Sequence, residues 1–140
     1  MNTAATNVIE RRLELTAPPE RVWAALTDPV EIAQWFGDSA ELDLRPGGHG
    51  YFGWTTHGRF AARVETVEPP SRLAWRWMHA PGADFDEAAS TLVEWVLTPR
   101  DGGGTILEVR ESGFKTEAHL EENTGGWKAE LADLTAHLGT

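Results

Sequence analysis

The feature that most constrains the fold is a series of short segments with alternating polarity, which gives way to one helical segment. Apolar residues occupy every second position in RLAWRWM (72–78), TLVEWVL (91–97) and TILEVRES (105–112), and a period of two is typical of strands with one buried face. Turn-forming sequences separate these segments, such as EPPS at 68–71. Strands that follow one another through short turns form an antiparallel sheet, so we expect a sheet with one face that another element covers.

One more strand and two short helices precede this series. Residues 8–16 alternate and predict the first strand. The segments APPERVWAALTDP (17–29) and VEIAQWFG (30–37) have apolar residues at helical spacing, with Pro where a helix can begin and Gly37 where the second can end. Further short strands are predicted at 41–45, 50–54 and 59–67.

From Thr116 to Leu138 the apolar period becomes helical. The stripe consists of Trp127, Leu131, Leu134 and Leu138. The acidic residues of this segment, Glu130 among them, mostly lie off the stripe, and the pair Gly125-Gly126 suggests close approach to another element. The sequence therefore predicts an α+β domain, with an antiparallel sheet of about six to seven strands wrapped around a long C-terminal helix.

Composition excludes several classes of function. A chain of 140 residues is expected to form one domain over 1–140, with a disordered tail at about 1–7. The net charge of −10 argues against nucleic-acid binding. No apolar run reaches the roughly 20 residues that span a bilayer, and no secretory signal or cysteine is found. We expect a cytoplasmic protein that uses no cofactor and contacts no membrane.

The segment RPGGHGYFGW (45–54) has two interpretations. A phosphate-binding loop would lead into a helix and usually carries a Lys. Here an alternating strand follows Pro46-Gly47-Gly48, and no Lys is near. The segment predicts a hairpin turn, because Pro presets one turn angle and Gly accepts a positive φ.

Aromatic residues gather on the predicted inner face. Seven tryptophans are present, and an indole combines a large apolar ring with an N–H that needs a partner when buried. The rings can fill the core, or they can wall a pocket for an apolar or aromatic ligand. The candidates for such a wall are Phe52, Trp54, Trp75, Trp77, Trp95 and Trp127.

Two charged residues also fall on predicted inner faces. Arg11 lies in the first strand, and Glu111 lies at the end of the last strand. A buried carboxylate needs a partner, so the two residues either form a structural salt bridge or present a polar head group to a ligand. A general-acid role for Glu111 is a further option if burial raises its pKa.

No metal site or catalytic residue is predicted. The five histidines show no ligand spacing such as HxxxH, and a metal site needs three or four convergent ligands. No G-x-S-x-G sequence marks a nucleophile.

Six motifs follow one another along the chain: LTDPVEIAQWF, LDLRPGG, VEPPSRLAWRW, STLVEWVLTP, GTILEVRESGF and GGWKAELADLTAHL. In order and spacing they resemble the motifs of activator-of-Hsp90-ATPase-like (AHSA1-like) domains in the START/Bet v 1-like (SRPBCC) superfamily. The resemblance covers about residues 8–138 and implies the helix-grip (Bet v 1-like) fold, with a hydrophobic cavity between sheet and helix. It also places Trp35 and Phe36 at the cavity mouth, where they act either as gate residues or as a plug.

Three functions follow from the pattern and the resemblance. The first is binding of a hydrophobic or aromatic small molecule in the cavity, by a protein that is not an enzyme. The second is a chaperone-interacting module, because the eukaryotic relative stimulates a chaperone ATPase. The third is a cyclase- or dehydratase-like enzyme, for which Glu111, His57 and Tyr51 are the candidate acid-base groups. We expect a monomer or a homodimer.

Overall fold

The computed structural model describes residues 8–139, and the predicted disordered tail at 1–7 lies outside the described residues. Within that range the order of elements is the predicted one. The elements are β1 (Val8–Leu15), α1 (Pro19–Thr27), α2 (Pro29–Trp35), β2 (Ser39–Leu42), β3 (His49–Trp54), β4 (Gly58–Glu68), β5 (Arg72–Trp77), the 3₁₀ turn η2 (Glu87–Ala89), β6 (Thr91–Pro99), β7 (Thr105–Ser112) and α3 (Glu117–Leu138).

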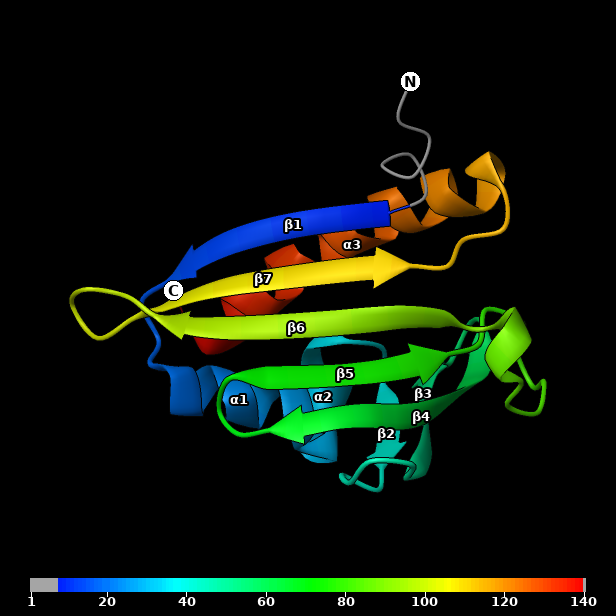
Figure 1. The fold of residues 1–140 in the computed structure, drawn as a ribbon, viewed down its shortest axis with the longest axis horizontal. Coiled ribbons are helices and arrows are strands. Elements are labelled where there is room, and N and C mark those ends of the chain that lie inside the picture. Colours follow the sequence, from blue (N-terminus) through cyan, green and yellow to red (C-terminus); the bar gives the residue numbers. More distant parts are fainter. Residues whose placement is uncertain (1–7, 140) are drawn as a thin grey trace.

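The strands form one antiparallel sheet of seven strands in the order β1-β7-β6-β5-β4-β3-β2. Figure 1 shows the three α-helices on one side of this sheet, with α3 running obliquely across it. The first strand, β1, pairs with the last strand, β7, so strands from the two ends of the chain are neighbours in the sheet. This arrangement confirms the helix-grip architecture.

The hairpin predicted at RPGG is confirmed. The backbone N–H of Gly48 donates to the carbonyl of Arg45 at 2.8 Å, and Gly47 has a φ of +84°. The turn joins β2 to β3, which pair antiparallel. A side chain at Gly50 in β3 would collide with the backbone carbonyl of Glu41 in β2, so the glycine allows the two strands to lie this close together.

The long helix α3 begins and ends at well-defined caps. The Thr116 hydroxyl accepts a hydrogen bond from the backbone N–H of His119, and Gly139 closes the helix in the left-handed conformation. The predicted apolar stripe faces the sheet, because Trp127, Leu131 and Leu134 are all buried. Burial of this stripe, rather than intrinsic helix propensity, is what fixes the helix on the sheet.

A polar triad ties the three helices together. Arg21 of α1 donates to the Glu31 carboxylate of α2 at 2.6 Å, and His137 of α3 lies 2.8 Å from the same carboxylate. Burial raises the pKa of Glu31, but the hydrogen bonds from His137 and Arg21 lower it by more. The triad fixes the position of α2, whose C-terminal end leads into the candidate site.

Candidate functional site

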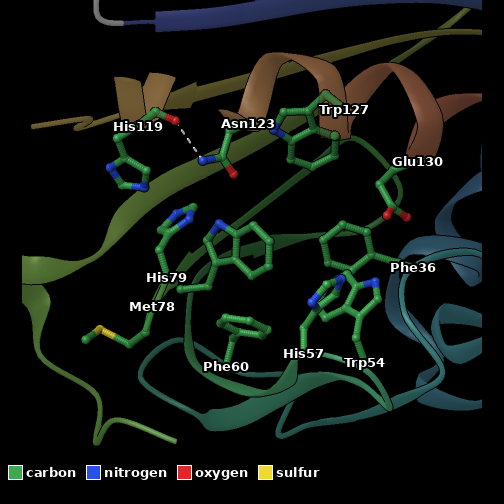
Figure 2. Close-up of a pocket in the computed structure, with 12 residues that line it drawn as sticks. Phe36, Trp54, His57, Phe60, Met78, His79, His119, Asn123, Trp127 and Glu130 are labelled. Atoms are coloured by element: carbon green, nitrogen blue, oxygen red, sulfur yellow. Dashed lines mark hydrogen bonds between the residues drawn. The ribbon is translucent and has the colours of Figure 1, made fainter. Parts of the chain in front are cut away.

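A pocket of about 350 Å³ lies between the sheet and the first half of α3. Figure 2 shows side chains from both sides converging on it, with Asn123, Trp127 and Glu130 coming from the helix. Five of the lining residues are aromatic: Phe36, Trp54, Phe60, Trp77 and Trp127. The others are His57, Met78, His79, His119, Asn123, Gly126 and Glu130. The lining is thus a set of aromatic walls with a few polar groups, the usual composition of a small-molecule site.

The structure separates the sequence-predicted aromatic residues into two groups. Phe36, Trp54, Trp77 and Trp127 line the pocket. The remaining four do not line it: Trp35, Phe52, Trp75 and Trp95. Burial alone does not separate the two groups, because Phe36, Trp77 and Trp127 are also buried core residues. The sequence could not make the distinction either, because the strand residues of both groups share one alternation and Trp35 and Phe36 are adjacent.

The gate-or-plug alternative has a different outcome for Trp35, the last residue of α2, and for Phe36, which follows it. Trp35 is 2% exposed and donates its indole N–H to the carbonyl of Ala25 at 2.8 Å. It therefore packs α2 against α1, as a plug does. Phe36 forms part of the pocket wall, and its ring centroid lies 5.4 Å from that of Trp77 and 5.8 Å from that of Trp127.

Gly37 holds Phe36 in this place. The glycine has a φ of +77°, and a Cβ there would collide with the carbonyl of Gly53 in β3. The chain can therefore turn sharply after α2 and present Phe36 to the sheet only because residue 37 has no side chain.

Glu111 is completely buried behind the pocket wall, where it holds two of the lining rings. Its Oε2 accepts a hydrogen bond from Trp77 Nε1 at 2.8 Å, and its Oε1 accepts one from Trp127 Nε1 at 2.7 Å. The Thr91 hydroxyl also donates to Oε2. The carboxylate therefore joins β5, β6 and α3, and it fixes the orientation of an indole on each side of the pocket.

His79 completes the carboxylate's surroundings. Its Nε2 lies 2.7 Å from the Thr91 hydroxyl oxygen and 3.3 Å from Glu111 Oε2. Because the Thr91 proton is donated to Glu111, the hydroxyl oxygen can accept from His79 in the tautomer that carries a proton on Nε2. Burial raises the pKa of Glu111, but its interactions with His79, Thr91, Trp77 and Trp127, led by that with His79, lower it by more, and the pKa lies below its usual value.

The predicted pairing of Arg11 with Glu111 is wrong. The sheet register places Ile9, not Arg11, opposite Glu111. Arg11 is exposed, and its guanidinium donates to the carbonyl of Glu10 at 2.7 Å. Since β1 is an edge strand, a long side chain on its inner face can turn outward to solvent. The lowered pKa of Glu111 also differs from the raised value that a general acid would need.

Three pocket residues of α3 were not predicted, because the apolar stripe was the only feature that indicated which face of the helix is buried. His119, Asn123 and Glu130 are spaced by four and seven residues, which places them on one face of α3 together with Trp127. Glu130 lies off the apolar stripe, as expected, but its side chain is half-buried and lines the pocket. Burial raises its pKa to about 7, with a further contribution from the nearby charge of Asp133.

The explanation of the glycine pair by close packing is wrong for Gly126. A Cβ built at this position meets no other atom within 4 Å. Gly126 lines the pocket instead, so the missing side chain leaves open volume where the helix passes over the site.

Among the side chains that the structure describes, no group of three or more His, Asp or Glu could hold a metal ion. None of the described helices has the length and apolar character that a membrane span requires.

The family model for "Activator of Hsp90 ATPase homolog 1-like protein" matches residues 16–139. The chain belongs to this family. The fold is that of the Bet v 1-like superfamily, which the sequence motifs had indicated. No curated protein matches the chain.

Solved structures of family-like proteins support the same assignment. Protein MLL2253 from Mesorhizobium loti is 26% identical, with a TM-score of 0.82, and the match covers 94% of this chain and 96% of that one. CalU16 from Micromonospora echinospora is 29% identical, with a TM-score of 0.74 and coverage of 94% and 75%. The Aha1 dimer from Colwellia psychrerythraea shares the fold at 19% identity, with a TM-score of 0.78 and coverage of 94% and 95%. The monomer-or-homodimer expectation stays a prediction for this chain.

Proposed function

We propose that this family member binds an apolar or aromatic small molecule in the pocket between the sheet and α3. The observation that carries the proposal is the wall itself: two indoles, from β5 and α3, are held in fixed orientations by one buried carboxylate. Rings that are already oriented lose little conformational entropy when a ligand packs against them. Burial of the ligand's apolar surface supplies the affinity, at about 25 cal/mol per Å².

A thermal-shift screen tests the proposal. A ligand present at about 100 times its Kd stabilises the folded state by about 2.7 kcal/mol, which corresponds to a rise in Tm of roughly 8 °C for a domain of this size. The panel should contain neutral aromatics, aromatic amines and aromatic acids. If no member raises the Tm, the proposal is contradicted.

Gly126→Leu is the matched variant for this screen. The leucine would extend into the open volume at Gly126 and replace a helix-breaking residue by a helix former, so the fold should not weaken. We expect ligand-induced shifts to disappear in this variant. Ala132→Leu adds the same side chain at an exposed position of α3 outside the pocket, and it should leave the shifts unchanged.

A second candidate is a module that acts on a chaperone, which the family description favours. Such a module needs a docking surface, and the large apolar residues exposed within the described range are Val30 and Leu44. The net charge of −10 favours a partner with a basic docking surface. A pull-down with an Hsp90-type chaperone, followed by an ATPase assay, distinguishes this function from ligand binding.

A third candidate is acid-base catalysis in the same pocket. The observation that favours it is Glu130, whose pKa of about 7 suits a group that exchanges protons at neutral pH. A Glu130→Gln variant that turns over a candidate substrate as fast as the wild-type protein would exclude a catalytic role for this residue.

A further inference from the structure

The charged groups around the pocket are of one sign. Glu130 lines it, Glu111 lies directly behind two of its rings, and the described lining residues include no Lys or Arg. The three lining histidines, His57, His79 and His119, are the other titratable groups. His79 lies 3.3 Å from Glu111, so any positive charge on it would be balanced at once by that carboxylate.

The aromatic walls add to this negative potential. The face of an aromatic ring carries partial negative charge and attracts cations, and indole does so most strongly. Both Trp77 and Trp127 donate their N–H to the Glu111 carboxylate, at 2.8 and 2.7 Å. Hydrogen bonds of this kind polarise their donors, which leaves more electron density on the two ring faces.

Glu130 is placed where an incoming cation would meet a carboxylate. It follows Trp127 by three residues on α3, and Figure 2 shows it extending from the helix among the residues that line the pocket. Burial, with a further contribution from Asp133, raises its pKa to about 7. No ion pair joins Glu130 to a Lys or Arg among the described residues, so a cation in the pocket would supply a counter-charge for its ionised form.

We propose that the pocket selects an organic cation, such as an amine or quaternary ammonium with an apolar or aromatic body, over a neutral or anionic molecule of the same shape. This inference rests on the proposed function, since it names the chemical class of the ligand for the same pocket. Aromatic rings contact the body and the substituents on the nitrogen, while Glu130 faces the positive charge. An anion would meet the Glu130 carboxylate, with the charge of Glu111 behind the rings, and no Lys or Arg among the described lining residues.

The test compares three probes of similar shape by calorimetric titration. They are benzyltrimethylammonium, its uncharged carbon isostere neopentylbenzene, and the anion benzenesulfonate. A cation–π site with a nearby carboxylate should favour the ammonium over the isostere by about ten-fold or more. Glu130→Gln should reduce this preference to a few-fold, whereas Glu121→Gln, an exposed position of α3 outside the lining, should leave it unchanged.

The affinity for the ammonium probe should change with pH in one direction. The titratable groups that face the pocket or Glu130 are His57, His79 and His119, together with Asp133 and Glu111. Loss of a proton by any of them, or by Glu130, makes the site more negative. Affinity for the ammonium should therefore rise between mildly acidic and mildly alkaline pH, while affinity for the isostere should not follow it.

The outcomes distinguish selectivity for a cation from the small-molecule binding on which that selectivity rests. If the isostere binds as tightly as the ammonium, and Gly126→Leu abolishes both interactions, the inference is overturned and the proposed function stands. If none of the three probes binds, both are overturned.

Discussion

Replacement of Glu111 by Gln should destabilise the protein strongly, although the two side chains have nearly the same shape. In the native site Oε1 accepts from Trp127, and Oε2 accepts from Trp77 and Thr91. An amide offers one acceptor oxygen and one NH₂ group, which is a donor. In either orientation the NH₂ group faces at least one buried donor, so an indole N–H loses its acceptor.

The expected loss of unfolding free energy follows from the number of buried polar groups that the substitution leaves unpaired. Each buried polar group without a partner costs about 1–3 kcal/mol, and the mismatch involves an indole N–H together with the amide N–H directed at it. We expect Glu111→Gln to lower the free energy of unfolding by about 3 kcal/mol, and the Tm by roughly 10 °C. Urea and thermal unfolding near neutral pH measure the loss.

A matched control is Glu108→Gln on the same strand. Glu108 is exposed, so its replacement should change stability by no more than about 0.5 kcal/mol. If Glu111→Gln unfolds at the same temperature as Glu108→Gln, the carboxylate does not organise the site and the reasoning is refuted.

The same variant has a characteristic response to acid. The folded-state pKa of Glu111 lies below the unfolded value of 4.5, so its contribution to stability is fully present above the unfolded pKa and is lost as pH falls through the folded one. The difference in stability between wild type and Glu111→Gln should therefore be constant near neutral pH and should narrow in acid.

Three further predictions concern individual positions. Gly126→Ala should stabilise the protein by about 1 kcal/mol in thermal unfolding, because a helical glycine is replaced and no atom is within 4 Å of the new Cβ; a loss of stability would show that the space is filled. Gly37→Ala should destabilise by more than about 1 kcal/mol, since φ is +77° and the methyl group would meet the Gly53 carbonyl; an unchanged Tm would contradict this. An NMR titration of the Glu130 carboxyl should give a pKa of about 7, and Asp133→Asn should lower it; an ordinary value would show that the residue is solvated.

The order of elements could be predicted because each local pattern agrees with the final fold. Alternation identified β5, β6 and β7, and the inward position of Glu111 followed from the same period. The RPGG turn could be identified because Pro presets one φ angle of a tight turn and Gly accepts a positive φ. The strands and this turn are determined by residues that are close together in the sequence, so the sequence alone predicts them.

The partners of Glu111 could not be predicted, because they depend on how distant elements are placed. A charged residue on the neighbouring strand, Arg11, was the obvious candidate, but an edge strand lets a long side chain reach solvent. Indole N–H groups from β5 and α3 replaced it. Similarly, an apolar stripe predicts which face of a helix is buried, but not that part of this face borders a pocket lined by a carboxylate such as Glu130.

The most direct test of the account is an NMR titration that follows the indole N–H signals of the uniformly ¹⁵N-labelled protein. With benzyltrimethylammonium as the probe, the signals of Trp54, Trp77 and Trp127 should shift together, whereas that of Trp23 on α1, outside the pocket, should not. The shifts should be absent in Gly126→Leu. Equal shifts at Trp23 and at the pocket indoles, or shifts that persist in Gly126→Leu, would contradict the claim that this aromatic-walled pocket is the binding site.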